Sequence, residues 1–366
     1  MKHAAAIALL LSGIAVAACE AQTSEPEPEV VAAVEQSLSL VPRPPWAAGD
    51  QKGMANTQGY GTRLRCAAHL IDPRSRTYEL SHERSETMPV SPFGVPLDYT
   101  FRPTSSVPFT RHAFNGETVC GEPAAQGTQM DALGHFAVMP APWDPASGPI
   151  PVGTAQYYGG YTQAQVKPTP DSPLLKLGVE NVPPIVTSAV LLDARTYLGG
   201  GNRLAPGQII TANDIKGMIQ AQGLGWRGLL PGDVLYIYTG WEDLWQDPDM
   251  LHEYYTKGPG LASDAAIYIG SKAVVLVALD NPFTDPVREG QLTGAAPPPD
   301  GTPPGLPFFI HHYNLTQSGV LQIQNAHLEE MAADGTWLSC TMILPLRERG
   351  GSGSPVRPVA FGSPTR

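Results

Sequence analysis

The segment GTQMDALGHF, residues 127–136, places three polar side chains among small and apolar neighbours. In an extended chain, residues two positions apart share a face, so Gln129 and Asp131 point the same way and His135 follows at the turn. Two oxygen donors beside an imidazole suit a hard divalent cation or a polar pocket with a proton shuttle. The alternative is a turn in which all three side chains are only hydrogen-bonded. Other segments of the chain favour the first interpretation.

Composition indicates a folded protein that does not bind nucleic acid. The chain has 366 residues, of which 42% are hydrophobic, enough for a substantial core. Its net charge of −11 repels polyphosphate, and no basic cluster could neutralise a nucleic-acid backbone. We therefore expect a small-molecule partner.

The first residues have the features of a secretory signal. Lys2 and His3 precede an apolar run over residues 4–18, which is too short to span a bilayer. The sequence Val-Ala-Ala-Cys ending at Cys19 resembles a bacterial lipobox, whose cysteine becomes lipidated. An ordinary signal with a chance cysteine is the alternative. We expect residues 1–18 to be removed and Cys19 to carry a lipid anchor. The anchor would be the only membrane contact, in the bacterial cell envelope, on the periplasmic side or the cell surface.

The rest of the chain divides into three parts. Residues 19–45 are rich in Pro, Glu and Ser and predict a flexible tether. Residues 46–346 predict one globular domain, and residues 347–366 a flexible C-terminal tail. Three cysteines remain, Cys66, Cys120 and Cys340, and an oxidising compartment permits one disulfide among them. The pairing stays open.

Periodicity in the domain predicts an α/β fold with mixed sheets. The runs SAVLLDARTYL, GDVLYIYTGW and KAVVLVALDN are almost continuously apolar, as in strands buried on both faces. Thr211 can cap a helix that Gly223 closes, and a second helix follows from Ser263. We also expect a helix over residues 62–71 with one apolar face, made by Leu64, Ala67, Ala68 and Ile71. The Pro-rich first third predicts antiparallel pairing.

Four separated segments resemble, in order, the cyclase family that includes kynurenine formamidase and isatin hydrolase. The first is WAAGDQKGMANTQGYGTRLRCAAHLIDPRSRTYELS, and the opening segment is similar to the family signature His-x-Gly-Thr-His-x-Asp-x-x-x-His. Beyond this motif, LLPGDVLYIYTGWEDLW, GPGLASDAAIYIGSKAVVLVALDN and HHYNLTQSGVLQIQNAHLEEM resemble later segments of the family, in order. The resemblance implies a single domain of the swivelling β/β/α type.

The resemblance also implies a metal site with departures from the family pattern. Asp131 matches the metal-binding acid and His135 the proton-transfer histidine, whereas Ala125 and Gln129 stand where the family has metal-binding histidines. The family's distal His precedes its Glu by twelve residues, which pairs His312 with Gln324 in place of the Glu. His311 would then lie on the opposite face. The expected ligands are Asp131, Gln129, His312 and Gln324. Such a set favours Mn²⁺, with Mg²⁺ or Zn²⁺ as alternatives.

The activity implied is hydrolysis of a C–N bond in an amide, formamide or lactam. His135 would transfer protons, Thr128 would donate to the developing oxyanion, and Trp241 would line the substrate cavity. His112, His252 and His327 are interpreted as surface or structural residues. The runner-up is a metal-poor envelope binding protein for a small aromatic or amide ligand, and a cysteine nucleophile is a third option. Family members are commonly dimers, so we expect a homodimer.

Overall fold

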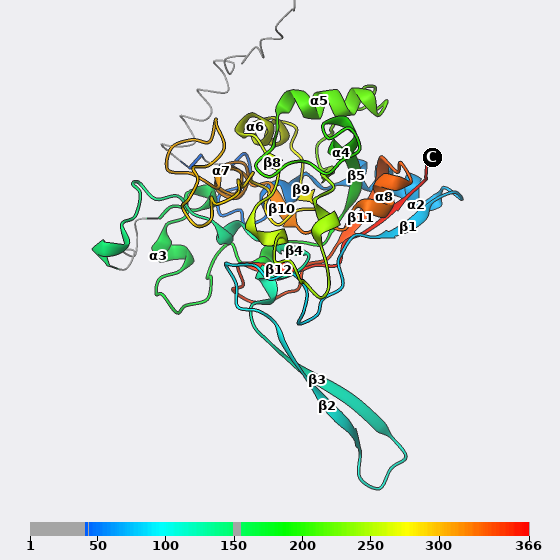
Figure 1. Cartoon of the computed structure of the whole chain (residues 1–366), viewed down its shortest axis with the longest axis vertical. Coiled ribbons are helices and arrows are strands. Elements are labelled where there is room, and N and C mark those ends of the chain that lie inside the picture. The colour runs from blue at the N-terminus through cyan, green and yellow to red at the C-terminus, as the bar shows by residue number, and fades with distance from the viewer. Residues whose placement is uncertain (1–40, 43, 149–154, 366) are drawn as a thin grey trace, which may run out of the picture.

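The computed structural model describes residues 41–42, 44–148 and 155–365. Its centre is one nine-stranded mixed sheet with helices packed against it, in a single α/β domain as predicted (Figure 1). The predicted signal peptide, Cys19 and most of the predicted tether lie outside the described residues. Within the described ranges, no helix combines the length and the apolar character needed to cross a bilayer.

Four adjacent parallel strands form the middle of the sheet. They are β5 (Ile185–Asp193), β7 (Val234–Tyr238), β9 (Leu276–Leu279) and β10 (Leu321–Gln324). Almost every residue in them is buried, because helices or other core segments cover both faces. This confirms the three strands predicted from continuous apolar runs. Their carboxyl ends share one edge, where α/β folds place ligands.

Antiparallel strands complete the sheet on both sides. The full order is β1-β13-β11-β5-β7-β9-β10-β4-β12. The outer strands are β1 (Arg76–Glu79), β4 (Gln129–Asp131), β11 (Leu338–Ile343), β12 (Gly353–Pro355) and β13 (Val359–Gly362). Strand β4 pairs with β10 on one side and with β12 on the other. The sheet is therefore mixed, as expected.

The predicted flexible tail over residues 347–366 is wrong. Strand β13 lies between β1 and β11, and β12 supplies the edge beside β4. Ala360 is fully buried in the core, and Ser354 is also buried. The Gly, Ser and Pro content of this segment reflects turns between short strands, and its backbone hydrogen bonds are satisfied by the sheet.

Two long helices cover one face of the parallel strands. Helix α5 (Ala212–Ala221) and helix α6 (Ser263–Ser271) contribute Ile215, Met218 and Ile269 to a core that includes Val190 and Leu235. Alternate strand residues, such as Leu191 and Tyr236, face a second core on the other side. Thr211 caps α5 through a hydrogen bond from the Asp214 N–H and a capping box, as the sequence predicts.

Helix α2 (Tyr60–Ile71) forms where expected but buries a different face. Thr62 and Cys66 are buried, whereas 53% of Leu64 and 80% of Ile71 are exposed. The reason is a disulfide between Cys66 and Cys340, which fixes this face of the helix against β11. Cys120 is exposed and free. The disulfide removes Cys66 and Cys340 as candidate nucleophiles.

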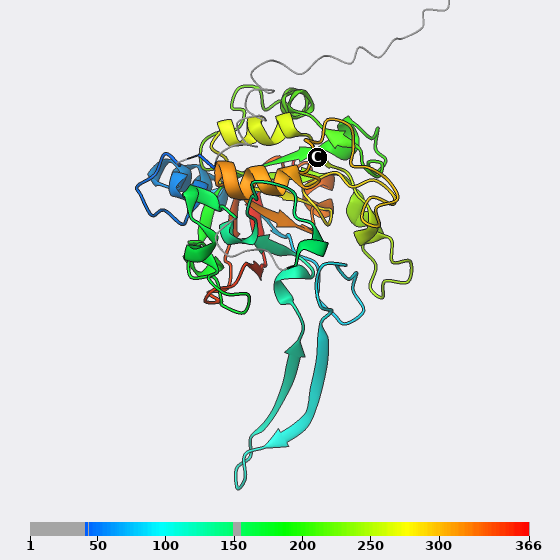
Figure 2. The same ribbon diagram turned by 90° about the vertical axis from the view of Figure 1, so that its left-hand side faces the viewer.

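A hairpin of strands β2 (Asp98–Ser106) and β3 (Ala113–Cys120) projects away from the body (Figures 1 and 2). Nearly all of its residues are exposed, including Phe101 and Phe114. The remaining elements are short: α3 (Gln163–Val166), α4 (Ala194–Tyr197), β6 (Ile209–Ile210), β8 (Gly260–Leu261), α7 (Phe309–His312), the π-helix η9 (Tyr313–Ser318), α8 (Glu329–Ala333) and several 3₁₀ turns.

Candidate functional site

The candidate site is built on the pairing of β4 with β10. Asp131 lies opposite Gln322, and Gln129 lies opposite Gln324, so all four side chains share one face of the sheet. The Nε2 atoms of Gln322 and Gln324 donate to Asp131 Oδ2 over 2.8 and 2.7 Å. Asp131 is 1% exposed. The predicted shared face of Gln129 and Asp131 is therefore present, and Gln322 belongs to it as well.

An imidazole from α7 completes this group. His311 Nε2 lies 3.6 Å from Asp131 Oδ2 and 3.4 Å from Gln324 Nε2. On the other side of the ring, His311 Nδ1 is hydrogen-bonded to Asp285, which also accepts from the backbone N–H of Ile310 over 2.6 Å. Burial alone would lower the pKa of His311, but the hydrogen bond and charge of Asp285, with the charge of Asp131, raise it.

The distal histidine of the site is His311, so the expectation for His312 is wrong. His312 lies on the same short helix, where its Nδ1 is 3.1 Å from the hydroxyl of Thr316 and its ring faces Phe309. The π-helix η9 separates α7 from β10. A π-turn holds one residue more than an α-turn. Counting twelve residues back from Gln324 therefore reaches His312, whereas its neighbour His311 faces the site.

His135 reaches the same site from the turn after β4. Its ring centroid is 6.3 Å from that of His311, and its side chain is exposed. The 3₁₀ turn Leu133–His135 is fixed by Gly134, where a Cβ would come within 2.9 Å of the Leu177 carbonyl oxygen. The His135 imidazole therefore lies near that of His311 and is open to solvent.

The Thr128 hydroxyl and the Trp241 indole both make hydrogen bonds within the fold. The Thr128 hydroxyl donates to the carbonyl of Asn325 over 2.5 Å and accepts from the His82 N–H over 3.0 Å. Its only hydroxyl proton is therefore used within the fold. Trp241 is 1% exposed, and its indole N–H donates to the Tyr254 carbonyl. It packs in a core cluster with Tyr254 and Tyr255.

The residue types of this group suit a hard divalent cation. The Oε1 atoms of Gln129 and Gln324 are buried and have no hydrogen-bond partner within the described ranges. Gln322 is different, because its Oε1 accepts from Thr284 and Asn314, which fixes its amide. Buried acceptors without donors are costly, and a cation would satisfy them. Ala125 supplies no ligand, so the set has one carboxylate, one imidazole and two carboxamides.

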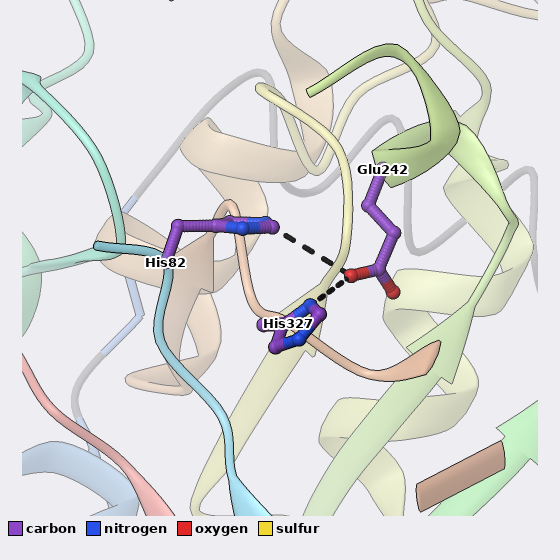
Figure 3. Close-up of side chains that lie close together, drawn as sticks. All are labelled: His82, Glu242 and His327. Carbon is purple, nitrogen blue, oxygen red and sulfur yellow. Dashed lines mark hydrogen bonds and ion pairs between the residues drawn. The ribbon is translucent and has the colours of Figure 1, made fainter. Parts of the chain in front are cut away.

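A second polar cluster lies at the carboxyl ends of the parallel strands (Figure 3). It consists of His82, Glu242 and His327, whose potential ligand atoms all lie within 4.8 Å of one another. His327 Nδ1 is 2.5 Å from Glu242 Oε2, and His82 Nε2 is 4.0 Å from the same oxygen. Sequence analysis missed this cluster, because its members come from three distant segments with no common spacing. His327 is not a simple surface residue.

Burial sets the charges near this cluster. Desolvation, with the charge of His327, lowers the pKa of His82 to about 3, so this ring is neutral. The hydrogen bond from His327 to the Glu242 carboxylate raises the pKa of His327, and burial raises that of Glu242. Asp280, the residue after β9, is fully buried. Desolvation and the charge of Glu242 raise its pKa to about 7.

The architecture is that of a known protein family. A model of the Cyclase family matches residues 78–286, more than half of the chain. The chain belongs to the Cyclase family. The solved structure of a novel cyclase is 26% identical with a TM-score of 0.67, and the match covers 86% of this chain and 97% of that one. No curated protein gives a significant match.

Two isatin hydrolases share the fold of this cyclase-family protein. Isatin hydrolase A from Ralstonia solanacearum is 18% identical, with a TM-score of 0.54, and the match covers 81% of this chain and 95% of that one. An isatin hydrolase bound to the product analogue thioisatinate is 15% identical, with a TM-score of 0.54, and the match covers 81% and 96%. At these identities the likeness establishes the fold alone.

Proposed function

We propose that this protein hydrolyses a C–N bond in a small amide, formamide or lactam at the Asp131–His311 site. Family membership and the fold shared with isatin hydrolases support a hydrolase-type activity. The observation that carries the proposal is the convergence of Asp131 Oδ2, the Gln324 amide and His311 Nε2 from three separate elements. A small aromatic substrate is the best match, by analogy with isatin.

The ligands for a divalent ion would be Asp131 and His311, joined by the carboxamide oxygens of Gln129 and Gln324. Asp285 holds the His311 ring through Nδ1, the carboxylate–histidine arrangement typical of metal-binding histidines. Oxygen donors dominate the set, which favours Mn²⁺ over Zn²⁺. When bound, such an ion polarises a carbonyl group and lowers the pKa of a water molecule.

His135 is the proposed proton carrier. Its exposed imidazole lies beside His311 at the edge of the site, where both substrate and water can approach it. In this role it takes a proton from the attacking water and returns one to the leaving nitrogen.

One observation favours a second candidate, a small-molecule binding protein on the same fold. Asp131 already accepts two amide hydrogen bonds, and Ala125 replaces a family ligand. A carboxylate satisfied in this way needs no cation. Such a protein would bind amide or aromatic ligands without turning them over.

Turnover measurements separate the two candidates. Full-length protein is assayed with isatin and N-formyl aryl amides, with and without added Mn²⁺, beside Asp131→Asn. Hydrolase function predicts Mn²⁺-stimulated turnover that Asp131→Asn abolishes. Absence of turnover with every substrate, while a ligand raises the melting temperature, would support the binding protein.

We also propose a homodimer formed through the β2–β3 hairpin. An isolated two-stranded hairpin is marginally stable in water, yet this one exposes 74% of Phe101 and 52% of Phe114. A second copy of the chain would bury these side chains. Light scattering should show a dimer for the wild type and a monomer for Phe101→Ser/Phe114→Ser. A monomeric wild type would contradict the proposal.

For location, we propose attachment to the bacterial cell envelope through Cys19. The Cys66–Cys340 disulfide supports an oxidising compartment. After cell fractionation, the wild type should sediment with membranes and Cys19→Ala should not. Equal distribution of both would contradict lipid anchoring.

A further inference from the structure

We propose that His82, Glu242 and His327 bind a transition-metal ion, best matched by Zn²⁺, at a site separate from Asp131 and His311. The two groups share no residue. Along the chain, Asn325 lies between Gln324 of the first group and His327 of the second. It adopts the left-handed conformation with φ of 57°, which asparagine tolerates. The chain turns there, so Gln324 faces Asp131 while His327 faces Glu242.

The strongest sign of a missing ligand is His82. Its side chain is 8% exposed, and its Nε2 atom is buried with no hydrogen-bond partner in the described part of the chain. The ring stacks on Trp245, with centroids 4.2 Å apart and planes 11° apart, and the backbone N–H is bonded to Thr128. The ring is therefore held in place and aimed at Glu242 (Figure 3).

The carboxylate is equally constrained. Glu242 Oε1 accepts from the Leu328 N–H over 2.9 Å, which leaves Oε2 as the atom that meets both imidazoles. Gly240 turns the chain after β7 with φ of 76° and so positions Glu242. A Cβ at residue 240 would lie 2.8 Å from Arg195 Cδ. The position of Glu242 is thus fixed by the surrounding backbone.

The spacing matches a metal site that is slightly open. Atoms that bind one zinc ion at about 2.0–2.2 Å lie about 3.4 Å apart. Here the two His–Glu separations are 4.0 and 2.5 Å, so shifts of about 1 Å or less would bring all three ligands to one ion. Two imidazoles and one carboxylate are a common zinc set that leaves a fourth position for water. The His327 side chain is 36% exposed, so water can reach this position.

The surroundings also favour a cation. Asp280, which follows β9, interacts electrostatically with Glu242. The charges of Glu329 and Glu330, on α8, interact with His327. A bound ion would tie together the segments after β1, β7 and β10, which lie far apart in sequence.

Zinc binding by variants tests the site. All variants carry Asp131→Asn, so that the first site cannot contribute. After equilibrium dialysis of the full chain against Zn²⁺, metal analysis should show one ion in this background. His82→Ala and His327→Ala should weaken binding at least tenfold. His252→Ala is the matched control, because His252 pairs with Asp249 at 3.5 Å but belongs to no such cluster.

A second measurement guards against misfolded variants. Zn²⁺ should raise the melting temperature of the background protein and of His252→Ala, but not that of His327→Ala, whose side chain is partly exposed and whose loss should leave the fold intact. If His82→Ala and His327→Ala retained as much zinc as the background protein, or if the background protein retained none, the proposal would be overturned.

Discussion

The Nε2 atom of His311 lies 3.6 Å from Oδ2 of Asp131, although the two residues come from distant parts of the chain. In the absence of a metal, the hydrogen bond and charge of Asp285, with the charge of Asp131, raise the pKa of His311 and so favour its protonated form. A divalent ion would compete with that proton, so binding should release it. Metal affinity is therefore expected to increase with pH.

Replacing Asp285 by Asn should weaken metal binding without removing a ligand. The carboxylate orients His311 through Nδ1, and loss of such a partner typically costs 10- to 100-fold in metal affinity. Mn²⁺ affinity can be measured by calorimetry. Asp300→Asn is the control, because Asp300 is exposed and pairs only with Arg288. Equal affinities for both variants would show that Asp285 has no part in the site.

His135→Ala should lower kcat by about 10²–10⁴-fold, the usual contribution of a proton-transfer group. Mn²⁺ affinity should stay the same, because His135 is not among the expected ligands. His112→Ala serves as the control, since His112 is exposed in the loop between β2 and β3. Full activity in His135→Ala would disprove the assigned role.

Stability should depend on pH through His311. Its pKa is raised in the folded state, against an ordinary value of about 6.5. Its contribution to the free energy of unfolding is therefore complete below about pH 6.5 and is lost as pH rises through the folded-state pKa. Urea unfolding of metal-free wild type and His311→Gln should show a stability difference that shrinks with increasing pH. A constant difference would contradict the raised pKa.

The disulfide should stabilise the fold by about 2–5 kcal/mol, because it closes a loop of 274 residues in the unfolded chain. Reductant, or the double variant Cys66→Ser/Cys340→Ser, should lower the urea midpoint by the corresponding amount. Cys120→Ser should not, since Cys120 is exposed and unpaired. An unchanged midpoint after verified reduction would show that the bond is energetically unimportant.

The sequence identified those site residues that lie close together along the chain. Asp131 and His135 come from one local motif, whereas Gln324 was assigned from the twelve-residue spacing that the family resemblance implies. Gln322 could also have been predicted from the sequence, because residues two apart in a strand share a face and Gln322 is two residues before Gln324. Choosing between His311 and His312 required the π-helix, which no periodicity indicates. Asp285 was missed because it acts only through a contact made in the folded chain.

The fold shows the same division between local and distant information. Continuous apolar runs predicted the buried parallel strands, and Thr211 predicted the start of α5. The prediction of which face of α2 is buried was wrong, because a disulfide and not apolar burial decides the orientation of this helix. Strand β13 was overlooked because Gly, Ser and Pro around a four-residue strand mimic a flexible tail. Its place is set by pairing with β1 and β11.

Anomalous diffraction can show whether Asp131 and His311 hold one divalent ion. Crystals of the full chain grown with Mn²⁺ would be measured on both sides of the manganese absorption edge. We predict a peak between Asp131 Oδ2 and His311 Nε2, with a carboxamide oxygen of Gln324 turned toward it. No peak there at saturating Mn²⁺, with the Gln324 amide nitrogen still bonded to Asp131, would contradict the account.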